Sequence, residues 1–135
     1  MTECLFLYGT LKPNQADDEV ADVIKRLRRI GSATVPGKLY DFGEYPGAIL
    51  SRNSSKKIHG EVFELPLERD ATLKALDEYE EFDVSNPDQS LFVRQRISAK
   101  LLDGRRVNCW IYVYNREPGD ARLITSGDYS QTKVA

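Results

Sequence analysis

The apolar residues of this chain fall into short runs separated by polar turns, a pattern typical of β-strands. The first run, residues 5–8, stops abruptly at Gly9. Five further strands are expected at 31–40, 45–50, 58–65, 91–102 and 106–114. The last two are separated by Asp103-Gly104, a dipeptide that strongly favours a hairpin turn. The pattern therefore predicts about six strands, most of them joined by short loops.

Two other segments carry apolar residues three and four positions apart, which predicts amphipathic helices. The first covers residues 16–30, and the second opens at Pro66 and runs to about Phe82. Proline is well tolerated in the first turn of a helix. The last turns of the first segment contain four basic residues, Lys25, Arg26, Arg28 and Arg29. We interpret them as a solvated helix face rather than a phosphate-binding patch, because the chain is acidic overall.

Six or so strands and two helices indicate an α+β fold built on a strongly curved or closed sheet. A chain of 135 residues suits one domain of ordinary size with a core of its own. We expect a single domain over residues 1–135. Residues 116–135 are expected to form a C-terminal tail that packs on this domain through Leu123, Ile124 and Tyr129.

Composition narrows the classes of function. A net charge of −2 gives no attraction to nucleic acid or anionic lipid. No apolar run approaches the roughly 20 residues that span a bilayer, and the N-terminus lacks the features of a signal peptide, so a cytoplasmic protein is expected. Cys4 and Cys109 lie in apolar strand segments and are expected to be buried free thiols. With His59 as the only histidine, no metal site is expected.

The turn after the first strand is a candidate binding element. A glycine allows a sharp turn, because it adopts backbone angles that a side chain forbids. Such a turn at Tyr8, Gly9, Thr10 and Leu11 would leave backbone N–H groups free to bind an anionic or carbonyl oxygen. The alternative is an ordinary exit from a strand into a loop.

The second predicted helix carries a carboxylate on its apolar side. At about 100° per residue, Leu73, Leu76 and Glu80 share one stripe, with Asp77 beside them. Burying a carboxylate costs several kcal/mol unless it is paired or protonated. Glu80 is therefore either a structural ion-pair partner of Arg94 or Arg96, on the following strand, or a general acid/base with a raised pKa.

Five segments, in order and at suitable spacing over nearly the whole chain, resemble motifs of the gamma-glutamylcyclotransferase-like proteins. Tyr8-Gly9-Thr10-Leu11 resembles their substrate-binding loop, and Leu76-Asp77-Glu78-Tyr79-Glu80 resembles their Leu-Asp-x-x-Glu helix, whose last residue is catalytic. The other three segments are Gly60-Glu61-Val62-Phe63, Phe92-Val93-Arg94 and Ser126-Gly127-Asp128-Tyr129. The resemblance implies a small mixed β-barrel flanked by helices.

The resemblance also implies a reaction, in which the α-amine of a γ-glutamyl group attacks its own side-chain amide and closes 5-oxoproline. An amine or amino acid is released, and no metal or organic cofactor is needed. Glu80 would be the general acid/base, and the residues expected to bind the small-molecule substrate are Tyr8, Gly9, Thr10, Leu11, Arg94 and Tyr114. Two residues depart from the family pattern: Phe92 stands in place of a tyrosine, and Glu81 in place of a glycine.

Two other functions remain open from the sequence. The first is a non-catalytic small-molecule binding or interaction module that keeps the same pocket. The second is a Cys–His hydrolase that uses Cys4 or Cys109 with His59, although these residues follow no nucleophile motif. The identity of the leaving group and the oligomeric state have no readable signal in the chain.

Overall fold

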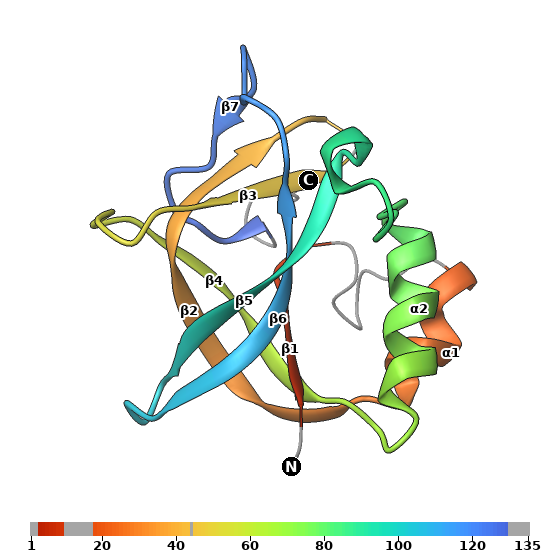
Figure 1. Ribbon diagram of the computed structural model, residues 1–135. Coiled ribbons are helices and arrows are strands. Elements are labelled where there is room, and N and C mark those ends of the chain that lie inside the picture. The colour runs from red at the N-terminus through yellow and green to blue at the C-terminus, as the bar shows by residue number, and fades with distance from the viewer. Residues whose placement is uncertain (1–2, 10–17, 44, 130–135) are drawn as a thin grey trace.

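The computed structural model describes residues 3–9, 18–43 and 45–129. Its elements follow the chain in the order β1 (Cys4–Leu7), α1 (Asp18–Lys25), β2 (Arg28–Asp41), β3 (Pro46–Leu50), β4 (Lys57–Glu64), α2 (Arg69–Tyr79), a short 3-10 helix (Pro87–Gln89), β5 (Phe92–Leu101), β6 (Arg106–Tyr114) and β7 (Arg122–Leu123) (Figure 1). Neither described helix is both long and apolar enough to cross a membrane.

Five strands close into a barrel in the order β2-β4-β1-β6-β5. The barrel closes where β5 returns to β2, at the pairs Ala33–Leu101 and Thr34–Lys100. The sheet is mixed, because β1 runs parallel to β6 while the other strand pairs are antiparallel. Strands β3 and β7 extend the sheet by pairing with the later part of β2. The predicted α+β barrel with two helices is confirmed.

Strand β2 is continuous through Pro36-Gly37, a dipeptide that commonly ends or interrupts a strand. It pairs with β4 as far as Pro36 and with β3 from Gly37 onward. Gly37 has a φ of +152°, and a Cβ there would lie 2.5 Å from the carbonyl oxygen of Ile49. Only glycine suits such a close strand crossing, so the dipeptide changes the strand's partner without ending the strand.

The apolar run of β1 is buried on both faces, which explains why it lacks polar alternation. Phe6 and Tyr8 belong to the cluster inside the barrel. Leu5 and Leu7 belong to a second cluster between the barrel wall and the helices, together with Ile24, Leu27, Leu73 and Leu76. Helices α1 and α2 lie next to each other on one side of the barrel (Figure 1). β1 thus connects the barrel core to α2.

The predicted extent of both helices was too long. Helix α1 ends at Lys25, and Arg28 and Arg29 begin β2 instead of completing a helix. The two arginines pair across the sheet with Glu64 and Glu61 of β4, at N···O distances of 3.1 and 2.6 Å. Cross-strand pairing of these side chains accounts for the early helix end. Helix α2 likewise begins at Arg69, three residues after Pro66, and ends at Tyr79.

The segment after β6 returns to the barrel. β7 pairs with β2, and Ile124 and Tyr129 are buried in the cluster inside the barrel. The backbone N–H of His59 on β4 donates a hydrogen bond to the carbonyl of Gly127, at 2.7 Å. Residues 122–129 therefore pack against both β2 and β4.

Candidate active site

Helix α2 ends in a Schellman turn that sets the direction of Glu80. Glu80 is the last helical-type residue, and its N–H donates to the carbonyl of Leu76. Glu81 has a φ of +58°, its N–H donates to Glu78, and the N–H of Phe82 donates to Asp77. These two bonds around one left-handed residue define the motif. The chain therefore leaves the helix axis immediately after Glu80.

The carboxylate of Glu80 is partly buried at this helix end. Burial raises its pKa from 4.5 to about 7, because a charged carboxylate is poorly solvated there. The partial negative charge of a helix C-terminus acts in the same direction. Within residues 3–9, 18–43 and 45–129, no ion pair to Glu80 is formed, so neither candidate partner neutralises it.

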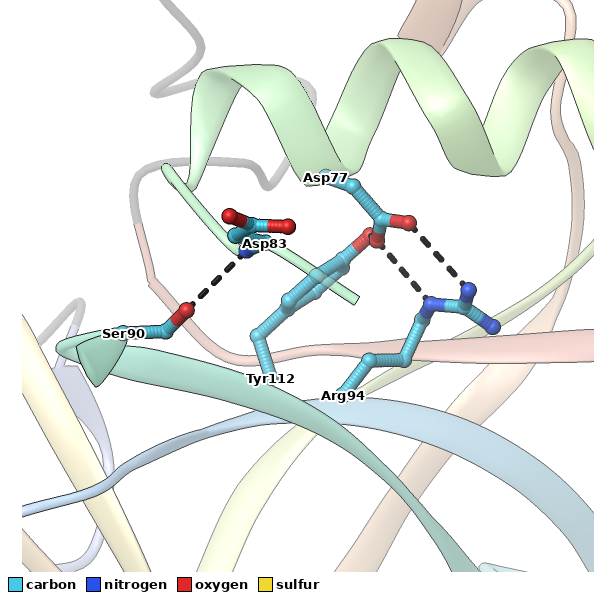
Figure 2. A network of polar contacts seen from close by, with 5 residues as sticks. All are labelled: Asp77, Asp83, Ser90, Arg94 and Tyr112. Carbon is cyan, nitrogen blue, oxygen red and sulfur yellow. Dashed lines mark hydrogen bonds and ion pairs between the residues drawn. The ribbon is translucent and has the colours of Figure 1, made fainter. Parts of the chain in front are cut away.

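The two arginines proposed as partners of Glu80 bind other carboxylates, so the structural ion-pair interpretation of Glu80 was wrong. Arg94 pairs with Asp77, with Nε and Nη2 at 3.0 and 3.2 Å from the two carboxylate oxygens. Arg96 pairs with Glu3 at 2.7 Å. Figure 2 shows Asp77 on α2 facing Arg94 and Tyr112 on the barrel wall. Asp77 is thus the paired, buried carboxylate of the helix.

Tyr112 is a site residue that the sequence analysis did not select. Its hydroxyl donates a 2.6 Å hydrogen bond to Asp77 Oδ1. The pKa of Tyr112 is raised by burial, by the hydrogen bond and charge of Asp77, and by the charge of Glu80. Trp110, Tyr112 and Tyr114 alternate along β6, and the hydrogen bond to Asp77 on α2 distinguishes Tyr112 from the other two.

Tyr8 links the end of β1 to the same region. Its hydroxyl donates to the main-chain carbonyl of Tyr112 at 2.5 Å and accepts from the N–H of Ala48 at 3.2 Å. Burial raises the pKa of Tyr8, and the charge of Glu80 raises it further. The charge of Glu80 thus contributes to the raised pKa of both Tyr8 and Tyr112. The hydroxyl proton of Tyr8 is already used in the hydrogen bond to the carbonyl of Tyr112.

Gly9 is required by packing rather than by its backbone angle. It is buried and does not adopt a positive φ, and a Cβ at this position would lie 2.6 Å from Cγ of Pro46. The predicted reason for the glycine was therefore wrong, although the close approach still demands it. Thr10 and Leu11, the other predicted residues of this turn, lie outside the described residues.

Tyr114 lies in an aromatic cluster with Phe42, Tyr45 and Phe92. Its ring stacks on Phe42 with centroids 4.2 Å apart and meets Phe92 edge-on at 5.6 Å. Phe92, where the family pattern has a tyrosine, is buried and also meets Tyr45 edge-on. The backbone at Gly47 closes onto this cluster, since a Cβ there would collide with Phe42 and Tyr114. Tyr114 is therefore held by its neighbours.

The loop between α2 and β5 is also fixed. The buried Ser90 accepts a hydrogen bond at Oγ from the N–H of Asp83, at 3.0 Å (Figure 2). The side-chain amide of Asn115 and the guanidinium of Arg116 both donate to the carbonyl of Ser90. These contacts hold the return of the chain from Glu80 to β5.

The thiol alternative has no chemical support in the structure. Cys4 and Cys109 are free and buried. Burial raises the pKa of both thiols, that of Cys109 to about 12, whereas a nucleophilic cysteine needs a lowered pKa. His59 is exposed on β4. Within the part of the chain that the structure describes, no three His, Cys, Asp or Glu side chains form a metal-binding group.

Comparison with known proteins settles the family. The family model described as "Gamma-glutamyl cyclotransferase, AIG2-like" matches residues 5–131. The chain belongs to this family. The match covers β1 to β7 and includes all five motifs that carried the resemblance.

Relatives of the gamma-glutamyl cyclotransferase family share the fold at low identity. The chain is 28% identical over 127 residues to the gamma-glutamylcyclotransferase family protein YtfP of Escherichia coli K12, covering 93% of this chain and 94% of YtfP. YkqA of Bacillus subtilis superimposes with a TM-score of 0.73 at 22% identity, over 98% of this chain but 41% of YkqA. An AIG2-like protein of Mus musculus superimposes with a TM-score of 0.67 at 22% identity, over 87% of this chain and 80% of the mouse chain.

Proposed function

We propose that this member of the gamma-glutamyl cyclotransferase family is an enzyme that converts a γ-glutamyl group to 5-oxoproline. The α-amine of the substrate attacks the δ-carbonyl carbon of its own side chain and forms the ring C–N bond. The original amide C–N bond breaks, and an amine or amino acid leaves. Glu80 takes the proton that the attacking amine loses and returns one to the leaving nitrogen.

The partly buried carboxylate of Glu80 carries this proposal. A general acid/base works best when its pKa lies near the working pH. With a pKa of about 7, Glu80 exists in both protonation states at neutral pH and supplies either role in turn. The oxygens of Asp77, one turn earlier, are instead occupied by hydrogen bonds from Arg94 and Tyr112.

Substrate binding is proposed for the end of β1. Backbone N–H groups at Gly9, Thr10 and Leu11 would hold the substrate carboxylate and the oxyanion that develops on the amide. Since nucleophile and electrophile belong to one molecule, the main task of these groups is to fold the substrate into a reactive shape. We propose that Tyr8 supports this turn through its ring and hydroxyl, and that Tyr114 contributes to substrate binding through the aromatic cluster.

The decisive experiment measures 5-oxoproline release from a panel of γ-glutamyl amino acids, γ-glutamyl amines and γ-glutamyl-ε-lysine. Glu80→Gln removes the proton-transfer group, and we expect kcat/KM to fall by at least about 100-fold. Glu78→Gln is the matched control, because Glu78 is an exposed carboxylate on the same helix. For the wild type, kcat/KM should rise with pH as Glu80 ionises near pH 7.

Undiminished turnover in Glu80→Gln would overturn the proposal. The non-catalytic binding module has its own signature in the same panel. In that case no compound releases 5-oxoproline, while at least one raises the melting temperature of the wild type and of Glu80→Gln equally.

A further inference from the structure

Asp77 is fully engaged by two strands of the barrel wall. Its Oδ1 accepts from Arg94 Nε at 3.0 Å and from the Tyr112 hydroxyl at 2.6 Å, and its Oδ2 accepts from Arg94 Nη2 at 3.2 Å. Arg94 on β5 and Tyr112 on β6 are direct cross-strand partners. Figure 2 shows both side chains reaching from the sheet to the same carboxylate. A bidentate arginine and a tyrosine together fix the orientation of that carboxylate.

Asp77 also belongs to the turn that ends α2. Its main-chain carbonyl accepts the N–H of Phe82, which closes the Schellman motif around Glu80 and Glu81. The residue three positions before Glu80 is therefore bound to the barrel by its side chain and to the helix end by its backbone. A shift of α2 along the barrel wall would break both sets of contacts.

Tyr112 connects the two halves of the candidate site. Its hydroxyl binds Asp77 on α2, and its main-chain carbonyl accepts the hydroxyl of Tyr8 at the end of β1. These two hydrogen bonds link α2, through Tyr112, to the strand end that carries Gly9. One residue thus sets the spacing between the helix and the proposed substrate-binding turn.

We propose that Asp77, Arg94 and Tyr112 position Glu80 for proton transfer, an inference that rests on the function proposed above. Arg94 was expected from the family resemblance to bind substrate. Its Nε and Nη2 both donate hydrogen bonds to Asp77. This is the pair of donors that would bind a substrate carboxylate in a bidentate, side-on geometry. Arg94 is therefore a positioning residue, and so are Asp77 and Tyr112.

The charges of the network have a consequence that a purely structural role would lack. Among the described residues, the charge of Glu80 acts on the hydroxyls of Tyr8 beside β1 and Tyr112 on β6, and Tyr112 in turn contacts the Asp77–Arg94 ion pair. Both tyrosines are neutral, because their pKa values are raised. The Asp77–Arg94 pair has no net charge, and burial is the main cause of the raised pKa of Glu80. Removing one member leaves a net charge about one helical turn away.

The first test is kinetic and uses variants that keep the fold. Tyr112→Phe retains the ring and deletes only the hydroxyl, and Arg94→Lys retains the charge but loses the bidentate geometry. We expect each to lower kcat by about 10-fold or more with little change in KM, because a small displacement of a proton-transfer group slows chemistry rather than binding. Melting temperatures establish that the variants are folded.

Arg96→Gln is the matched control. Arg96 lies on the same strand as Arg94, contacts the same Trp110 ring at 4.3 Å against 4.4 Å for Arg94, and also pairs with a carboxylate, Glu3. It makes no contact with Asp77, so its replacement should leave kcat unchanged. If Tyr112→Phe and Arg94→Lys behave like Arg96→Gln, the positioning role is overturned.

The second test needs no turnover. The carboxyl 13C resonance of Glu80 is titrated by NMR in Asp77→Asn and Arg94→Gln. Asp77→Asn leaves the cation of Arg94 uncompensated and should lower the pKa of Glu80, while Arg94→Gln leaves the anion of Asp77 and should raise it, each by about one unit. Shifts of the same sign, or none, would overturn the inference. Loss of activity in Glu80→Gln, or its retention, decides the proposed function separately.

Discussion

Glu80 is held in a state that costs the folded protein stability at neutral pH. Its pKa is raised from 4.5 to about 7 by burial. The folded state therefore holds the proton more tightly than the unfolded state does. Stability conferred by this residue falls as the pH rises from about 4.5 to about 7, and the full cost is present above that range. Such a cost is typical of a residue retained for chemistry.

Replacing Glu80 by glutamine should therefore stabilise the protein above pH 7. We expect Glu80→Gln to raise the free energy of unfolding by about 1–2 kcal/mol at pH 8, after allowance for the solvent access of a partly buried group. At pH 4.5 the difference should be close to zero, because the wild-type carboxyl is then protonated. Urea unfolding at both pH values measures it. Equal stability of the two proteins at pH 8 would contradict a raised pKa.

The residue pattern of α2 identified two carboxylates, Asp77 and Glu80, on or beside its apolar side. It did not predict which of them forms an ion pair within the described part of the chain and which stays unpaired there. The period of 3.6 residues placed Asp77 and Glu80 near the same apolar side. It could not say which one meets an arginine, because Arg94 and Tyr112 reach Asp77 only through the pairing of β5 with β6 and the docking of α2 on both. Partner choice is thus a property of the tertiary structure.

At the scale of the element, the end of α2 contains a residue that its backbone does not favour. Glu81 occupies the left-handed position of the Schellman turn, with a φ of +58°. A left-handed conformation costs a residue with a side chain about 1–2 kcal/mol, which is why glycine usually stands there. In the sequence, Glu81 departs from the family pattern, which has glycine there. The structure shows that this departure strains the backbone, because Glu81 adopts a left-handed conformation.

Glu81→Gly should stabilise the protein by about 0.5–1 kcal/mol. The gain is smaller than the strain it relieves, because glycine also adds conformational freedom to the unfolded chain. The measurement is the urea midpoint at constant m-value. Glu81→Ala is the control, since it removes the charge but keeps the strained conformation. An equal gain in both variants would assign the effect to charge instead of backbone strain.

The boundaries of elements were the part of the fold that local patterns predicted least well. The apolar period of the first helix continues through Leu27, which packs with Ile24 between helix and barrel. The chain nevertheless changes to a strand at Arg28, because Glu64 and Glu61 on β4, 36 and 32 residues further along the chain, offer partners to Arg28 and Arg29. The β5–β6 hairpin rests on its local Asp103-Gly104 turn, whereas this boundary depends on a distant strand.

At the scale of the whole molecule, the barrel core is completed by residues from the far end of the chain. Ile124 and Tyr129 are 5% and 1% exposed and pack in the same cluster as Phe6. Gly127 has a φ of +71° and lies against β4, where a Cβ would come within van der Waals overlap of the carbonyl oxygen of Lys57. This glycine permits the close approach that seats Tyr129.

Gly127→Ala should therefore destabilise the protein far more than its backbone angle alone explains. Gly119→Ala is the matched control, because Gly119 has a similar φ of +58° and open space around it. Both variants pay the left-handed cost of about 1–2 kcal/mol. Gly127→Ala should lose about 2 kcal/mol more, because overpacking against a backbone carbonyl displaces the segment.

Displacement of this segment also breaks the hydrogen bond from the His59 N–H to Gly127, so hydrogen exchange at the His59 amide should accelerate in Gly127→Ala but not in Gly119→Ala. Urea unfolding provides the free energies, and exchange locates the change. If both alanine variants lose the same stability and protect His59 equally, residues 124–129 are not needed to complete the core. Because β4 pairs directly with β1, weaker hydrogen bonding of β4 would also affect β1, the strand that leads to Gly9.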